Sequence, residues 1–92
     1  MFAAAEVYQI LSPVYERIAN WNPRIDPAKI KTLSCQYLIW NDGSLGCPMP
    51  GCCYTQALVP GFLIIIEHEN VIYEVHTDIA MTSIAIPNIG FI

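Results

Sequence analysis

The sequence predicts an α+β fold in which an N-terminal helix packs on a small antiparallel sheet of three to four strands. Three observations favour it: residues 3–20 carry apolar side chains at helical spacing, residues 31–40 alternate as a strand does, and residues 62–78 have the pattern of a β-hairpin. Strands that follow one another without intervening helices are typical of antiparallel sheets. At 92 residues the chain has the length of one domain, spanning residues 1–92.

The helix is predicted over residues 3–20, with an interruption at Pro13. Its apolar face is formed by residues that recur at steps of three and four: Val7, Ile10, Leu11, Val14 and Ile18. A proline inside a helix removes a hydrogen bond and clashes with the preceding turn. We therefore expect a helix that is kinked at Pro13 or split there into two short ones.

The first strand is predicted over Lys31–Trp40, after a connection in which Asp26 caps a single turn. One face of this strand looks like a core face and consists of Leu33, Cys35, Tyr37 and Ile39. The other face is mixed and consists of Ser34, Gln36, Leu38 and Trp40. The strand is expected to stop at Asn41-Asp42-Gly43, which is a strong turn signal.

The stretch from Trp40 to Gly61 holds three of the four cysteines, three of the seven prolines and four of the five glycines. Proline fixes φ and donates no backbone hydrogen bond, so residues 47–51 are expected to form a stiff, exposed loop. Residues 52–59 are compatible with either a short strand or a loop. Pro60-Gly61 is expected to form a turn or a bulge.

The clearest hairpin joins strands at Phe62–Glu67 and Val71–Asp78 through a polar connection at residues 67–70, in which Asn70 tolerates a left-handed conformation. The apolar tail, residues 79–92, is expected either to add an edge strand that ends at Pro87 or to pack on another subunit.

Composition limits the classes of function. Apolar residues make up 54% of the chain and charged residues 13%, which favours a protein partner or a dimer because a small domain has little interior. A net charge of −4, with four basic residues, excludes a nucleic-acid binder. No stretch has the length of a membrane span and no signal peptide is visible, so we expect a cytoplasmic protein with free thiols rather than two disulfides.

A long motif runs through the centre of the chain. It reads Trp40-x-Asp42-Gly43-Ser44-Leu45-Gly46-Cys47-Pro48-x-Pro50-Gly51, then Tyr54-x-Gln56-x-Leu58-x-Pro60-Gly61, and later Tyr73-x-x-His76-Thr77-Asp78. It resembles an uncharacterised family of small bacterial domains, largely cyanobacterial. The resemblance covers about 40 residues and implies a helix followed by a strand upstream, with no established activity. Asn70, where the family tends to have glycine, and the Cys52-Cys53 pair depart from its pattern.

The cysteines and histidines raise two chemical alternatives. Zinc needs about four ligands, and adjacent Cys52 and Cys53 do not both chelate easily, so we expect no metal and no cofactor. A thiol-dependent enzyme or redox protein would use Cys47 as nucleophile and His76 as base, with Asp78 or Asp42 orienting the histidine.

The stiff loop instead favours a non-enzymatic interaction domain, because a rigid loop loses little entropy on binding. It would present residues 42–61 to a protein partner, in an inhibitor-like manner in its sharpest version. The residues expected to bind are Trp40, Asp42, Ser44, Leu45, Cys47, Pro48, Pro50, Tyr54 and Gln56. The third alternative is a structural subunit of a larger assembly, which the apolar tail favours.

Overall fold

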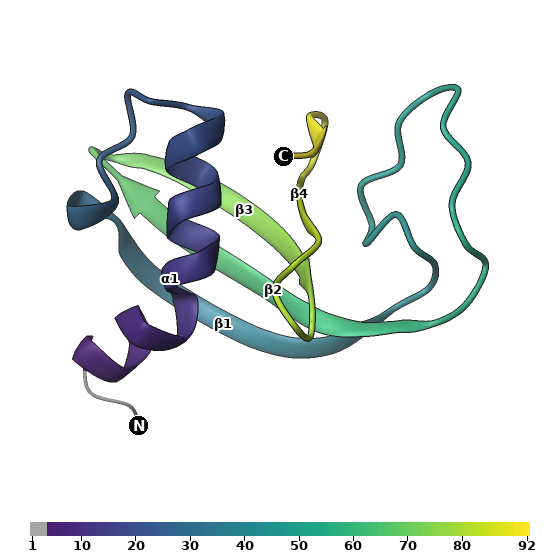
Figure 1. The fold of residues 1–92 in the computed structure, drawn as a ribbon, viewed down its shortest axis with the longest axis horizontal. Helices are drawn as coiled ribbons and strands as arrows, with labels where there is room; N and C mark the ends of the chain where they lie inside the picture. The colour runs from purple at the N-terminus through teal and green to yellow at the C-terminus, as the bar shows by residue number, and fades with distance from the viewer. Residues whose placement is uncertain (1–3) are drawn as a thin grey trace.

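A computed structural model describes residues 4–92 and shows one helix packed on a five-stranded antiparallel sheet (Figure 1). The strands follow one another in the sheet in chain order. The elements are α1 (Ala4–Trp21), a 3₁₀ turn η1 (Pro27–Lys29), β1 (Lys31–Trp40), β2 (Val59–His68), β3 (Val71–Asp78), β4 (Ile84–Ile86) and β5 (Gly90–Phe91). The α+β prediction is confirmed, with one strand more than the three to four expected.

The core lies between α1 and one face of the sheet. Its fully buried side chains come from α1, β2, β3 and β4, and include Leu11, Val14, Ile18, Ile64, Ile66, Val75 and Ile84. The helix continues through Pro13 rather than splitting. Figure 1 shows that the helix axis bends, as expected for a helix with a proline that cannot bond to the preceding turn. Residue 3 and the side chains of Val7 and Ile10 lie outside the described part of the chain.

The central hairpin is tighter than predicted. β2 continues to His68, so the connection consists of Glu69 and Asn70 alone, both with positive φ (49° and 67°). His68 is buried, and its Nε2 accepts a hydrogen bond from the backbone N–H of Asp26 at 3.1 Å. This contact extends β2 to His68, which the sequence analysis placed in the polar connection of the hairpin.

β2 also begins earlier than predicted, because Pro60 and Gly61 lie inside it rather than forming a turn. Pro60 is paired with Ile39 of β1, whereas β3 ends at Asp78, opposite Gly61. At Pro60, therefore, β2 has a neighbour on one side only, which is the situation in which a sheet tolerates proline. Residues 52–57 form no strand.

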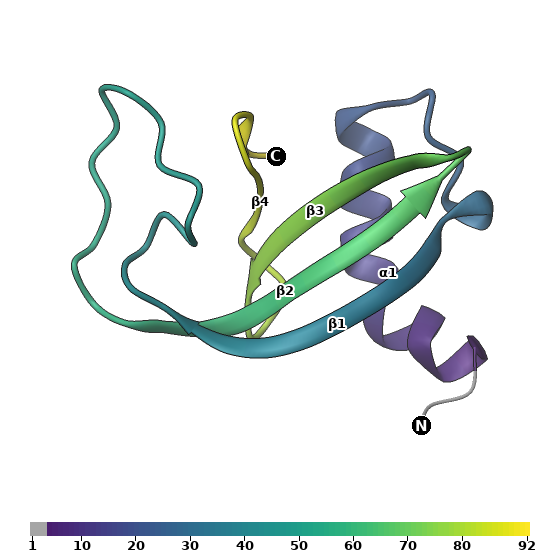
Figure 2. The same cartoon turned by 180° about the vertical axis from the view of Figure 1, so that it is seen from behind.

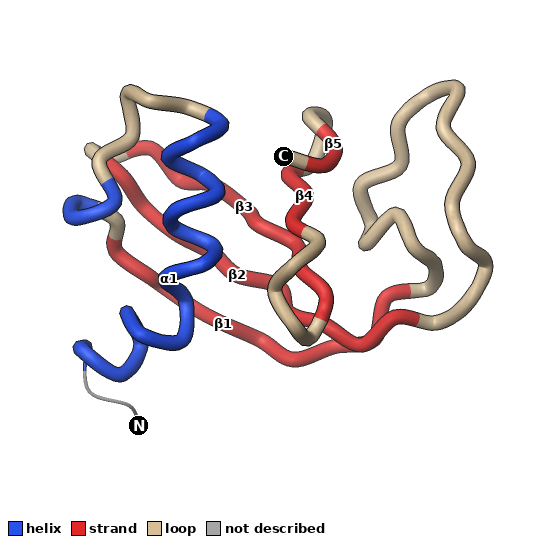
Figure 3. The backbone as a smooth tube through the Cα atoms, in the orientation of Figure 1, coloured by secondary structure: helices blue, strands red, loops and turns tan. Residues whose placement is uncertain are grey.

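The tail folds onto the chain's own core. It forms two short strands (Figure 3), of which β4 is an inner strand and β5 the edge, and all three residues of β4 are buried. Pro87 follows β4, as expected. The Arg17 guanidinium of α1 donates to the carbonyl of Ile92 at 3.0 Å and to that of Thr82 at 3.3 Å. The tail is thereby held against the helix.

The predicted core face of β1 is largely exposed, which corrects the sequence analysis. Leu33, Tyr37 and Ile39 are 52%, 55% and 54% exposed, and Cys35 is exposed as well. β1 is the edge of the sheet, and the core is built over β2, β3 and β4, which Figure 2 shows from behind. Across residues 4–92 we find no helix with the length and apolarity needed to cross a membrane.

Candidate binding site in the loop between β1 and β2

Hydrogen bonds close the first part of the loop between β1 and β2, residues 41–58. The Asp42 carboxylate accepts from the backbone N–H and the hydroxyl of Ser44, at 2.9 and 2.5 Å, and both bonds hold the pKa of Asp42 below its usual value. The N–H of Gly43 donates to the carbonyl of Thr55 at 2.8 Å, which joins the two sides of the loop.

The second part of the loop is fixed in the same way. The N–H of Met49 donates to the hydroxyl of Tyr54 at 3.1 Å, and the N–H of Cys47 to the carbonyl of Ser44 at 3.0 Å. Leu45 and Gly46 have positive φ, which turns the chain inward. Leu45 and Cys47 are buried as a result. Specific bonds therefore hold residues 47–51, the loop that was predicted to be stiff and exposed, but Cys47 is buried rather than exposed because it faces His76.

His76 of β3 anchors the loop to the sheet. Its Nδ1 lies 2.5 Å from the carbonyl oxygen of Leu45 and 3.3 Å from Cys47 Sγ, and its Nε2 lies 2.7 Å from a carboxylate oxygen of Glu74. Trp40 stacks on the imidazole, with ring centroids 4.4 Å apart and planes 14° apart. We call these five residues the His76 cluster.

Trp40 reaches His76 by lying across β2. Its indole N–H donates to the carbonyl of Thr77 at 2.9 Å. Gly61 of β2 lies beneath this crossing, where a Cβ atom would be 2.8 Å from Trp40 Nε1. The absence of a side chain at Gly61 therefore allows the indole to reach β3.

The thiol in this cluster is not activated. Burial, and secondarily the charge of Glu74, raise the pKa of Cys47 to about 11, and the side chain is 2% exposed. The carbonyl of Leu45 can only accept, so the proton on Nδ1 of His76 is directed to it at 2.5 Å. An Nδ1 that donates in this way cannot take the proton of Cys47. The geometry is that of a structural anchor.

The carboxylates predicted to orient His76 do not contact it. Asp78 accepts hydrogen bonds from Thr82 and Ser83 in the turn before β4, and Asp42 is engaged with Ser44. Glu74, which the sequence analysis did not select, lies beside the imidazole instead. It shares the strand face of His76, and the period of two along β3 is the signal that could have identified it.

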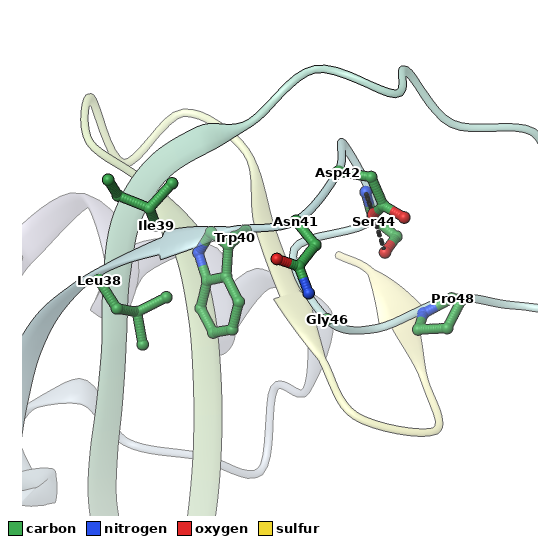
Figure 4. A pocket seen from close by; sticks show the side chains of 8 residues that line it. All are labelled: Leu38, Ile39, Trp40, Asn41, Asp42, Ser44, Gly46 and Pro48. Carbon is green, nitrogen blue, oxygen red and sulfur yellow. Dashed lines mark hydrogen bonds between the residues drawn. The ribbon is translucent and has the colours of Figure 1, made fainter.

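A hollow of about 530 Å³ opens beside the cluster, where β1 enters the loop (Figure 4). It is lined by Leu38, Ile39, Trp40, Asn41, Asp42, Ser44, Gly46 and Pro48. Four residues predicted to bind therefore surround one hollow. Leu45 and Cys47 lie buried in the loop, and Pro50, Tyr54 and Gln56 do not line the hollow. The sequence analysis missed Leu38, Ile39, Asn41 and Gly46.

The remaining cysteines form no site with these residues. All four thiols are free, and Cys35, Cys52 and Cys53 are exposed. In the described residues no three His, Cys, Asp or Glu side chains are grouped so that they could hold a metal ion. His68 bonds to Asp26, so it takes no part in the His76 cluster.

Comparison with known proteins places the site in a family. A family model described as "Domain of unknown function (DUF8738)" matches residues 16–85. The chain belongs to the DUF8738 family. The matched DUF8738 region contains the whole of β1, β2 and β3, the loop between β1 and β2, and all five members of the His76 cluster. The predicted resemblance to an uncharacterised family of small domains is confirmed to this extent. No curated protein and no solved structure matches the chain.

Proposed function

We propose that this DUF8738 domain is a non-enzymatic protein-binding domain that presents the loop of residues 42–61 and receives part of its partner in the hollow. The observation that carries this proposal is the combination of an open hollow of about 530 Å³ with walls that are already fixed by hydrogen bonds. A preformed concave site avoids the ordering cost of binding.

The chemistry of the walls indicates what would bind. Trp40, Leu38 and Pro48 provide apolar surface, and aromatic anchors dominate binding energy at protein interfaces. Asp42 is the charged residue of the lining, and its depressed pKa keeps it ionised at neutral pH. These features suit an apolar side chain followed by a basic group. Exposed Pro48 and Pro50 next to the hollow are compatible with the inhibitor-like version.

A peptide selection tests the proposal. A random peptide library displayed on phage, selected on the immobilised domain, should enrich peptides that carry an apolar residue near Lys or Arg. Asn41→Trp would fill the hollow from its exposed rim and should weaken binding at least about tenfold. Glu16→Trp, on the exposed face of α1, is the matched control and should bind normally. Equal binding by both variants would refute a site in the hollow.

The thiol-dependent enzyme remains the second candidate because Cys47 and His76, 29 residues apart, do meet at 3.3 Å. Burial of the thiol and its raised pKa oppose this function.

Alkylation of the native protein distinguishes the two functions. A pKa near 11 instead of 9.0 leaves about a hundredfold less thiolate at pH 8, and burial slows the reaction further. Cys52 and Cys53, which are exposed, should therefore react with iodoacetamide in the native protein, and Cys47 only after denaturation. Mass spectrometry of digested protein identifies the sites. Rapid native labelling of Cys47 would favour the enzyme.

We propose that the motif from Trp40 to Gly61 is characteristic of bacterial, largely cyanobacterial, members of the family, and that the protein acts in the cytoplasm. The structural-subunit alternative has less support in the tail than expected, because the residues of β4 are buried on the chain's own core. The tail still exposes Ile79, Ile89 and Phe91, as many large apolar side chains as β1 exposes.

A further inference from the structure

β1 is a long edge strand with little to prevent it from pairing. It is ten residues long, its outer edge faces no other described strand, and it contains no proline. Its one charged residue, Lys31, and its one irregularity, the register shift between Thr32 and Ser34, lie at the same end. Proteins usually protect such edges with charges, prolines and bulges along the strand. Residues 34–40 have no such protection.

The side of β1 that faces the helix layer is apolar and uncovered. Tyr37 and Ile39 are both more than half exposed on this side, and Cys35 is exposed beside them. The first turns of α1 extend past β1, beyond the edge of the sheet (Figures 1 and 2). In sequence, residues 4–10 contain one charged residue, Glu6. A helix end that projects beyond a sheet edge is placed to cover a neighbouring strand.

The ends of β1 carry opposite charges. Lys31 begins the strand and makes no ion pair with another described residue. Asp42, which is ionised at neutral pH, lies two residues beyond the end of the strand at Trp40. Two copies of the strand running antiparallel would place each Lys31 near the other copy's Asp42. Such a pairing repeats the same contact twice, as a two-fold interface requires.

We propose that the outer edge of β1 binds a second copy of this chain, in an antiparallel two-fold pairing with Tyr37 next to the axis. The two sheets then form one continuous sheet of ten strands. Cys35 lies opposite the second copy's Ile39, and the N-terminal turns of each α1 lie over the apolar side of the other copy's β1. Side chains directly opposite in such a pair have Cβ atoms about 5 Å apart.

This pairing also changes the hollow. Leu38 and Trp40 line it from the side of β1 that faces away from α1. In the same register the second copy's Gln36 lies beside Leu38 and its Ser34 beside Trp40. The second copy thus adds a polar wall, so a ligand of the hollow would contact both chains. The pairing itself does not depend on the proposed binding function.

Light scattering after size-exclusion chromatography tests the pairing. The full chain should have twice its monomer mass of 10.3 kDa at high micromolar concentration. Tyr37→Lys brings two like charges together at the axis and should give 10.3 kDa, as should Ile39→Lys. Ile72→Lys, equally exposed on β3, is the matched control and should remain dimeric. Circular dichroism verifies folding.

A monomeric wild-type chain would overturn the proposal, and so would a dimer that survives both lysine variants. The register has its own test, because Ile39→Cys should form an interchain disulfide with native Cys35 on mild oxidation. Mass spectrometry of the digest should recover that linkage, whereas Ile72→Cys should give no interchain link to Cys35. A dimer that is sensitive to Tyr37→Lys but lacks the linkage would contradict the axis at Tyr37.

Discussion

Gly61→Ala is expected to lower the free energy of unfolding by at least about 4 kcal/mol, which is most of the stability of a small domain. The added Cβ would lie 1.9 Å from the carbonyl oxygen of Thr77 and 2.8 Å from Trp40 Nε1. Neither atom can yield cheaply, because the first belongs to the backbone of β3 and the second donates to that carbonyl. The variant would have to separate β2 from β3 at this point and displace the indole.

Urea denaturation followed by tryptophan fluorescence measures this loss, which corresponds to a fall in Tm of about 20 °C. Gly51→Ala is the matched control. Gly51 has a φ of 80° but no atom within 4 Å of a Cβ, so it should lose only about 1 kcal/mol, the cost of left-handed backbone. Similar losses in the two variants would show that the crossing of Trp40 over Gly61 does not decide stability.

The strands were predictable where local signals agree at both ends. The bounds of β1 and β3 match the prediction because each alternating run stops at turn residues, Asn41-Asp42-Gly43 for β1 and Glu69-Asn70 before β3. β2 was predicted too short because Pro60 is a turn signal locally. Its strand conformation depends on where β3 ends, opposite Gly61, which only the assembled sheet determines.

The exposure of β1 shows a second limit of predicting structure from the sequence. Alternation identifies two faces of a strand but not which of them a helix will cover. Leu33, Tyr37 and Ile39 are the kind of side chains that form a core face. The core, however, lies between α1 and the inner strands, and these three side chains of β1 are exposed. If β1 pairs with a second copy, composition identified a buried face correctly and the sequence did not reveal which chain covers it.

The sequence analysis selected two residues of the site that do meet, but it did not select the carboxylate that contacts the histidine. Cys47 and His76 were selected as a pair, and they meet. Three acidic or imidazole side chains, Glu74, His76 and Asp78, share one face of β3, and sequence spacing does not rank the two carboxylates. Asp78 is diverted by the N–H groups of Thr82 and Ser83, which belong to the turn that follows. That diversion leaves Glu74 as the partner of the imidazole.

His76→Leu is the second large effect expected, about 3 kcal/mol of lost stability. Leucine keeps much of the volume but donates no hydrogen bond, so the buried carbonyl of Leu45 loses its 2.5 Å partner. An unsatisfied buried acceptor costs about 1–3 kcal/mol, and the lost ring stacking on Trp40 adds up to about 1.5 kcal/mol. Urea denaturation at neutral pH gives the total.

Hydrogen exchange identifies the part of the chain that loses stability in His76→Leu. Because His76 joins the loop to β3, amides of residues 42–58 should exchange faster in His76→Leu, while those of β2 beside α1 remain protected. Glu74→Gln is the control, because the Glu74 side chain is 47% exposed and a glutamine amide can either donate to or accept from His76 Nε2, so the expected loss is below about 1 kcal/mol.

These two variants also decide what the buried thiol and imidazole are for. If His76→Leu releases the loop and weakens peptide binding in the hollow while Glu74→Gln preserves both, then His76 acts by holding Leu45 and so positioning Gly46, which lines the hollow. If His76→Leu leaves stability and loop exchange unchanged, the loop is held by the bonds of Asp42, Gly43 and Met49 alone. The Cys47–His76 pair would then be available for chemistry that an anchoring role forbids.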